Sequence, residues 1–378
     1  MNTNRALSLL LLTSLTACSS TGSAQEGSKT AFMGAPAFEQ VQVFTNERFP
    51  NVVVTLEGTV LATWGASTVR ARRSEDGGRS WGEEITIGRG IQGGGTTVDE
   101  GTGDILAFVE DQHPPAPLNM YRSQDDGRSW AAEEITIGAD PAGNVPSMHM
   151  NERGITLRHG EHAGRLIRPA RWYAGKNDHS KWPEHYTTSI FSDDGGRTWL
   201  TSGAFPENGT GEAAIVELSD GSLYYNSRIH WDQRPDNTRR RSARSEDSGE
   251  TWTDHDIVEV LPDGHQHRSY GCMGGLVRLP VDGEDWLVFS NIDTPNPTRE
   301  RITVWASPDG GRTWPMKRLV FDGPGAYSSL SAGRPGTESE GWIYLHYEGG
   351  PNGGSTMARF NLAWILEGEA TGDGAWPR

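Results

Sequence analysis

Short apolar runs, separated by clusters of turn-forming residues, recur along most of the chain, and no helical period of 3.6 residues is sustained. The clearest runs, rich in Val, Ile, Leu, Thr and aromatic residues, cover residues 51–56, 104–109, 215–218, 286–290 and 343–347. β-Branched and aromatic residues favour strands, whereas Gly, Pro, Asn and Asp favour the turns between them. The pattern predicts an all-β fold made of many short strands.

An eight-residue motif, Ser-x-Asp-x-Gly-x-Ser/Thr-Trp, is repeated along the chain. Its copies begin at Ser74, Ser123, Ser192, Ser245 and Ser307. Successive copies lie roughly 50 to 70 residues apart, which is in and above the range of four-stranded propeller blades. Asp and Ser side chains hydrogen-bond nearby backbone amides, Gly permits a positive φ, and Trp packs beneath the turn. We therefore interpret the motif as a structural hairpin turn, with two strands before it and one after it in each repeat.

Both ends of the repeated region carry strand patterns without the motif, at residues 40–44 and 357–365. If strands from the two ends share a sheet, the ring closes and no sheet edge is left free. We therefore predict a six-bladed β-propeller, with seven blades as the alternative. It is expected to form a single domain over residues 37–366, followed by a tail over residues 367–378.

The charge of the chain restricts its ligands. The formal net charge is −16, which argues against a nucleic-acid-binding surface. The only lysines are Lys29, Lys176, Lys181 and Lys317, so nearly all positive charge is carried by Arg. Arg is suited to paired hydrogen bonds with carboxylates. An anionic partner is therefore expected to bind at a local Arg cluster.

The N-terminus has the pattern of a targeting segment. An apolar run over residues 6–15 follows Arg5 and is too short to span a bilayer, so residues 1–17 are interpreted as a signal peptide. The run ends in Leu-Thr-Ala-Cys at Cys18, which resembles the lipobox of bacterial lipoproteins. This implies lipidation of Cys18 and membrane anchoring in the bacterial cell envelope through a flexible tether over residues 18–36. A plain secretory signal is the alternative. Only Cys272 is left in the body, so no intramolecular disulfide and no Cys-based metal site is expected there.

Four stretches hold polar residues that strand packing does not require. They are Arg-Phe-Pro at Arg48, Gly-Glu at Glu212 with Asn-Ser-Arg at Arg228, Arg-Glu-Arg-Ile-Thr-Val at Arg299, and Ala-Tyr-Ser-Ser-Leu at Tyr327 with His-Tyr-Glu at Glu348. In this order, and with the repeated motif, they resemble the bacterial sialidases (neuraminidases), a family of six-bladed propellers. The resemblance covers almost the whole body of the chain. The motif alone is weakly specific, because other carbohydrate-active propellers carry it, but the ordered set is much more specific.

The resemblance implies a carboxylate-binding site. Arg48, Arg228 and Arg299 correspond to the arginine triad that clamps the carboxylate of a sugar acid, and Glu348 corresponds to the residue that holds Arg48. The chemistry is reasonable in itself, because guanidinium groups offer planar paired donors to a carboxylate and stay charged at any working pH. The expected partner is an anionic carbohydrate.

The resemblance also implies a covalent mechanism, with Tyr327 as nucleophile and Glu212 as its base. A sugar that carries a carboxylate at its anomeric carbon repels an anionic nucleophile, so a neutral phenol polarised by a carboxylate suits it better. An isolated phenol, with a pKa of about 10, needs such a partner to attack near neutral pH. The implied activity is release of a terminal sialic acid or related 2-keto sugar acid with retention of configuration.

The sequence departs from the sialidase pattern at the acid/base catalyst. Sialidases carry an Asp between the first strand and the first motif, but residues 62–73 contain no Asp, Glu or His. By blade order, the nearest replacements are Glu110, Asp111 and His113, which follow the run over residues 104–109. A different sugar acid, a good leaving group or another reaction would also account for the gap.

Two other functions fit parts of the pattern. Some propeller polysaccharide lyases use a His/Tyr pair with an Arg on uronate-containing glycans, and His149, Tyr173 and Arg171 lie in a region rich in these residues. A non-catalytic glycan-binding propeller would keep the arginines but have no use for Tyr327 and Glu212. No His-Glu-x-x-His or similar spacing is present, so neither a catalytic metal nor another cofactor is expected. A monomer is expected.

Overall fold

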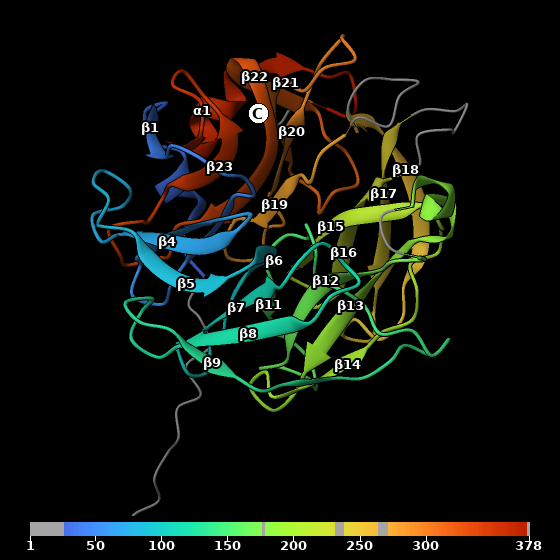
Figure 1. Cartoon of the computed structure of the whole chain (residues 1–378). Coiled ribbons are helices and arrows are strands. Elements are labelled where there is room, and N and C mark those ends of the chain that lie inside the picture. The colour runs from blue at the N-terminus through green and yellow to red at the C-terminus, as the bar shows by residue number, and fades with distance from the viewer. Residues whose placement is uncertain (1–25, 176–177, 231–237, 264–270, 376–378) are drawn as a thin grey trace, which may run out of the picture.

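The computed structural model describes residues 26–375 except 176–177, 231–237 and 264–270. The described residues form six four-stranded antiparallel blades arranged around a central axis (Figure 1). The first strands of neighbouring blades contact one another, as β2 does with β6 and with β22, which places the first strands around the axis. The expected six-bladed propeller is confirmed.

The first three blades follow one another along the chain. Blade 1 comprises β2 (Asn51–Val54), β3 (Val60–Trp64), β4 (Thr68–Ser74) and β5 (Ile85–Arg89). Blade 2 comprises β6 (Ile91–Val98), β7 (Ile105–Glu110), β8 (Leu118–Ser123) and β9 (Ala131–Glu133). Blade 3 comprises β11 (Ile155–Thr156), β12 (Leu166–Trp172), β13 (Tyr186–Ser192) and β14 (Thr198–Thr201), with β10 (Thr136–Ile137) parallel to β14.

The last three blades complete the ring. Blade 4 comprises β15 (Thr210–Glu217), β16 (Leu223–Ile229), β17 (Arg239–Ser245) and β18 (Thr253–Pro262). Blade 5 comprises β19 (Gly275–Arg278), β20 (Leu287–Ile292), β21 (Glu300–Ser307) and the first part of β22 (Met316–Ala332). Blade 6 comprises the rest of β22, β23 (Ile343–Gly349), β24 (Ser355–Phe360) and β1 (Phe38–Phe44). β25 (Glu369–Ala370) pairs with β22, and the helices are the 3₁₀ turns η1 (Lys29–Phe32) and η2 (His179–Glu184) and the short α1 (Leu362–Leu366).

Strands from the two ends of the chain close the ring in blade 6, as the sequence predicted. β1 pairs with β24 from Phe38 opposite Phe360 to Phe44 opposite Ser355. The second end was expected to continue as a strand to residue 365, but the strand stops at Phe360. The side chain of Asn361 accepts a hydrogen bond from the backbone amide of Trp364, and this cap starts α1 in place of further strand.

The repeated motif is the turn between the third and fourth strands of blades 1 to 5, so one more strand precedes it than expected. In the fifth copy, Ser307 Oγ donates to Asp309 Oδ1 at 2.8 Å and accepts from the amide of Gly311 at 2.9 Å. Gly311 has φ 84°, which a side chain would strain. Trp314 is fully buried below the turn. These contacts support the structural interpretation of the motif.

Apolar side chains on the facing surfaces of neighbouring blades form the core. Between blades 2 and 3, for example, Leu106 and Phe108 pack against Leu166, Ile190 and Trp199, all of them buried. The ring centroids of Phe108 and Trp199 lie 5.6 Å apart in an edge-to-face arrangement. This packing fixes the blades relative to one another, and with them the strand ends that carry polar residues.

The described part of the expected tether, from Glu26 onward, is docked on the propeller. Glu26 pairs with Arg278 at the end of β19, Gly27 bridges to Val281, and Phe32 is 2% exposed in the core of the last two blades. Ion pairing and burial of Phe32 therefore join this part to the fold, whereas the sequence predicted a flexible tether over residues 18–36. Cys18 and the signal segment lie outside the described residues. No helix among the described residues is long and apolar enough to cross a membrane.

Candidate active site

The candidate residues lie at one end of the blades because of the strand directions. First and third strands run one way and second strands the other, so the starts of the former meet the ends of the latter. Arg48 and Arg299 precede a first and a third strand, and Glu212 and Tyr327 lie near the starts of the first-strand segments of blades 4 and 6. The ends of second strands supply Glu110, Arg171, Arg228 and Glu348. The register set by the motifs thus brings distant segments to one face.

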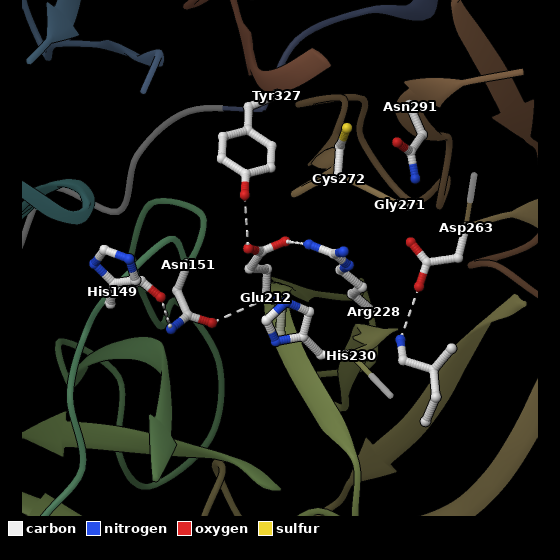
Figure 2. Close-up of polar contacts among 12 residues, drawn as sticks. His149, Asn151, Glu212, Arg228, His230, Asp263, Gly271, Cys272, Asn291 and Tyr327 are labelled. Atoms are coloured by element: carbon white, nitrogen blue, oxygen red, sulfur yellow. Dashed lines mark hydrogen bonds and ion pairs between the residues drawn. The ribbon is translucent and has the colours of Figure 1, made fainter. Parts of the chain in front are cut away.

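Tyr327, Glu212 and Arg228 form a buried chain of polar contacts (Figure 2). The Tyr327 hydroxyl donates to Glu212 Oε1 at 3.0 Å, and an Arg228 guanidinium nitrogen donates to Glu212 Oε2 at 2.5 Å. Burial raises the pKa of Glu212, but Arg228 and Arg171 lower it further, so its net pKa lies below the usual value. Burial and the Glu212 charge raise the pKa of Tyr327. The pair is therefore a neutral phenol bonded to a carboxylate that can accept its proton.

The other two arginines flank the ring of Tyr327. The guanidinium carbons of Arg48 and Arg299 lie 5.1 Å and 5.0 Å from its centroid. Arg48 is held by Glu348 through two parallel hydrogen bonds of 3.1 and 2.9 Å, and Glu348 also accepts from the amide of Phe49. Arg48, Phe49 and Arg299 are partly exposed, so the cluster opens to solvent there. The three arginines expected to bind a carboxylate therefore lie around one tyrosine.

A second cluster, on the loop before β11 and at the end of β7, pairs an imidazole with a carboxylate. His149 Nδ1 lies 2.9 Å from Glu110 Oε2, and Ser147 Oγ donates to Glu110 Oε1. Both side chains are nearly buried. The His113 ring packs on His149 with centroids 4.6 Å apart. Glu110 and His113, two of the candidates for the general acid, therefore lie against His149, which the sequence assigned to the alternative lyase site.

Arg171 is fully buried at the end of β12, and its hydrogen-bond partners there are uncharged side chains. It donates to the Tyr173 hydroxyl at 2.9 Å, to His185 Nδ1 at 2.8 Å and to His230 Nδ1. Burial and the Arg171 charge lower the pKa of His185 to about 4 and that of His230 well below its usual value. Both imidazoles are therefore neutral and accept hydrogen bonds. Arg171 supplies a fourth positive charge beside Glu212.

Backbone contacts join the two clusters. The side chain of Asn151, which lies between His149 and Glu212 in Figure 2, accepts from the amide of Ala213 at 3.0 Å. The amide of Glu152 donates to the carbonyl of Ala213 at 2.8 Å. Phe49 stacks on Tyr327 with centroids 5.8 Å apart and meets His149 edge-on at 6.3 Å. The loop that carries His149 is thereby fixed beside Glu212 and Tyr327.

The remaining acid candidate, Asp111, is not part of either cluster. It is exposed, and its carboxylate accepts a hydrogen bond from Asn119 at 2.7 Å. Glu47 contacts the turn of the segment that lacks an acid, where it accepts from the amides of Ala66 and Ser67 at 2.8 and 2.9 Å. Burial raises the pKa of Glu47, but Arg70 and these amides lower it to about 2. Glu47 therefore stays ionised and caps the loop.

Several residues of the site were given no role from the sequence, namely Phe49, Ser147, Asn151, Glu152, His185 and His230. His230 follows Arg228 by two positions, and the alternation of strand side chains gave a signal that it shares that strand face. Asn151 and Glu152 contact the backbone of Ala213 in blade 4. No local sequence pattern indicates a contact between blades of this kind. Among the described residues, no group of three or more His, Cys, Asp or Glu side chains is arranged to hold a metal ion.

Glu152 is a buried carboxyl group between Asn51 and Ser329. Its Oε1 accepts from Ser329 Oγ at 2.6 Å and from Asn51 Nδ2 at 3.2 Å, and its Oε2 has no partner among the described residues. Ser329 follows Tyr327 by two positions on β22, just beyond the register shift between Gly325 and Ser328. Burial raises the pKa of Glu152 to about 7. At neutral pH this carboxyl is therefore near half-protonated.

We expect Glu152→Gln to stabilise the protein at alkaline pH. The folded state binds the Glu152 proton more tightly than the unfolded state, whose pKa is near 4.5, so wild-type stability falls as pH rises from about 4.5 to about 7. The full effect is about 3 kcal/mol. Gln keeps an acceptor for Ser329 and Asn51 without the charge. Denaturant unfolding at pH 5 and pH 8 should show the variant gaining over wild type only at pH 8; an equal difference at both pH values would contradict this assignment.

Fold and repeat together define the chain as a BNR-repeat propeller. Residues 65–338 match the family model described as "BNR repeat-like domain". The chain is 31% identical to a sialidase of Micromonospora viridifaciens, over 96% of this chain and 60% of the relative. It is 28% identical to a sialidase of Bacteroides fragilis, over 73% of this chain and 55% of the relative. The chain thus spans somewhat over half the length of these curated relatives.

Solved structures share the fold at low sequence identity. The intramolecular trans-sialidase from Ruminococcus gnavus, in complex with oseltamivir carboxylate, superimposes with a TM-score of 0.64 at 17% identity, covering 85% of this chain and 97% of that one. Trypanosoma rangeli sialidase gives a TM-score of 0.60 at 17% identity, covering 88% and 60%. The chain belongs to the BNR repeat-like domain family, and bacterial sialidases are among its relatives there.

Proposed function

We propose that the protein is an exo-glycoside hydrolase that releases a terminal sialic acid or a related 2-keto sugar acid with retention of configuration. The observation that carries the proposal is the Tyr327–Glu212 hydrogen bond of 3.0 Å, flanked by Arg48, Arg228 and Arg299. The sialidase relatives support the same reaction class. A carboxylate bound by the arginines would place the anomeric carbon, to which it is attached, close to the Tyr327 oxygen.

The contacts suit a two-step displacement. As the Tyr327 oxygen bonds to the anomeric carbon, its proton passes to Glu212, which is already hydrogen-bonded to it. Arg228 and Arg171 keep Glu212 ionised in the resting state, so the base is available. Because the attacking phenol is neutral, it avoids the repulsion that an anionic nucleophile would meet at a carboxylate-bearing carbon. Water then releases the sugar and Tyr327 recovers its proton.

Product analysis tests this proposal. The purified protein should release free sugar acid from α-linked sialosides, and proton NMR of early time points should show the α-anomer first. An unsaturated product absorbing in the ultraviolet from uronate polymers, without sialoside hydrolysis, would favour the lyase chemistry of His149, Tyr173 and Arg171. Saturable glycan binding without turnover of any substrate would favour a binding propeller. Either result would overturn the hydrolase proposal.

We also propose that Cys18 anchors the protein in the bacterial cell envelope. The described chain enters the propeller at Glu26, which pairs with Arg278 and Arg158 where the first strands end. The catalytic candidates lie at the opposite strand ends, so an anchor attached before Glu26 would point the candidate active site away from the bilayer. Membrane fractionation of wild type and Cys18→Ser tests this. Equal partition of the two proteins would refute the anchor.

A further inference from the structure

The proposed hydrolysis leaves one proton unassigned. Cleavage of a glycosidic bond to an ordinary alcohol requires a proton on the departing oxygen, because an alkoxide is a poor leaving group. Tyr327 and Glu212 handle only the proton of the nucleophile. Residues 62–73, which form most of β3 and β4 with the turn between them, contain no acidic or imidazole side chain. The donor must therefore come from another part of the site.

The carboxyl groups around the site do not suit this role. Glu47 has a pKa of about 2 and is saturated with hydrogen bonds, so it holds no proton to give. Glu348 is paired with Arg48, and Asp111 is exposed and bound to Asn119. Glu152 is partly protonated at neutral pH, but it is 1% exposed and its carboxyl is bonded to Ser329 and Asn51, out of contact with any substrate.

We infer that His149 is the general acid and base of this site, with Glu110 as its positioning residue. In this role, Glu110 accepts a hydrogen bond from Nδ1–H of His149 at 2.9 Å, which leaves Nε2 to exchange the second proton. Nε2 has no hydrogen-bond partner among the described residues. Phe49 touches both His149 and Tyr327, so the imidazole lies on the nucleophile's side of the site. The inference rests on the proposed hydrolase function.

The structure holds His149 rigidly. Ser147 Oγ accepts from the amide of His149 at 3.0 Å while donating to Glu110, which locks the carboxylate and the loop together. Met150 has φ 54°, a strained conformation for a residue with a side chain, and Asn151 ties the loop to the strand of Glu212. Such strain is retained where the surrounding contacts determine the geometry, as they do here.

The titratable groups that face His149 are Glu110 from β7, His113 from the following loop and Tyr173 after β12. Burial and the nearby His149 lower the pKa of His113, with a smaller contribution from Arg171. Burial raises the pKa of Tyr173, which accepts from Arg171. His113 and Tyr173 are therefore neutral, and among these groups the Glu110 carboxyl is the one hydrogen-bonded to His149 Nδ1, at 2.9 Å.

The proton transfers balance over the two steps. In the first, the bond from the anomeric carbon to the leaving oxygen breaks, its electron pair stays on that oxygen, and the Nε2 proton of His149 joins it. The Tyr327 oxygen bonds to the carbon as its proton passes to Glu212. In the second, neutral His149 takes a proton from water, whose oxygen replaces Tyr327. Glu212 then returns its proton to Tyr327, and every group is restored.

The test compares leaving groups. His149→Asn should lose about 10²- to 10³-fold in kcat/KM on a methyl sialoside, but less than about tenfold on the 4-nitrophenyl sialoside, whose phenolate departs without a proton. The alkaline limb of the wild-type pH profile on the methyl substrate should vanish in the variant. Tyr327→Phe should lose activity on both substrates. Activity of Tyr327→Phe therefore tests the hydrolase proposal, whereas the dependence of His149→Asn on the leaving group tests the role of His149.

Two further variants control for structure. Glu110→Gln should keep the shape of the pair but shift the alkaline limb to lower pH, since the imidazolium loses its counter-charge. His159→Asn removes another imidazole near a carboxylate, 3.2 Å from Glu217 at the far end of the blades, and should leave both rates unchanged. Equal losses of His149→Asn on both leaving groups, or full activity on the methyl sialoside, would overturn the assignment. So would an unchanged alkaline limb in a folded Glu110→Gln.

Discussion

Tyr327→Phe is expected to reduce turnover of every active glycoside by at least about 10³-fold while the protein stays folded. The phenol oxygen is neutral, lies between the arginines and donates a hydrogen bond to the Glu212 carboxylate at 3.0 Å. In the proposed mechanism its removal abolishes the covalent step, so the rates with good and poor leaving groups should fall alike. Steady-state kinetics with an aryl sialoside and an alkyl sialoside would measure this loss.

The structural cost of the change is expected to be small. Glu212 loses one hydrogen bond but keeps Arg228, so the free energy of unfolding should fall by about 1–2 kcal/mol. Tyr344→Phe is a matched control, because that buried hydroxyl also makes one hydrogen bond, to the carbonyl of Gly77 in the first motif, far from the site. Its kcat should equal that of wild type. Wild-type rates in Tyr327→Phe would refute the nucleophile.

The architecture could be predicted from the sequence because its determinants are local and repeated. Each motif specifies a turn through contacts within eight residues, such as Ser307 with Asp309 and Gly311. Five copies then set which strand ends lie on one face. Closure by β1 and β24 followed from the need to cover free edges. The stop at Asn361 was missed because one capping side chain outweighed a strand-like composition.

Site residues could be predicted only where they lie at strand ends whose position is fixed by the repeated motifs. Arg48, Glu212 and Tyr327 satisfy that condition, and the structure brings them together. The His149–Glu110 pair could not be foreseen as a unit, because 39 positions separate the two residues and a loop carries one of them. The sequence indicated Glu110 as an acid and His149 as part of a lyase site. Only the fold shows that they are one hydrogen-bonded pair.

Arg48→Gln should raise KM strongly for substrates that carry the carboxylate and reduce kcat/KM by about 10²-fold, because a charge-assisted paired contact is lost. Glu348→Gln should reduce kcat/KM by about tenfold. Glu348 acts through the orientation of Arg48, which it holds by hydrogen bonds of 3.1 and 2.9 Å. The double variant should be no worse than Arg48→Gln alone. Such non-additivity is expected when two residues contribute to binding as one unit.

A substrate without the negative charge separates binding from folding in this series. The methyl ester of the same sialoside should be hydrolysed poorly by wild type, and Arg48→Gln should lose little further activity on it, because the missing guanidinium has no carboxylate to bind. Arg79→Gln is the matched control: Arg79 belongs to the first motif and pairs with Glu338 at 3.3 Å, and its loss should leave KM unchanged on both substrates. If Arg48→Gln impaired ester and free acid equally, Arg48 would support the fold of the site and would not bind the carboxylate.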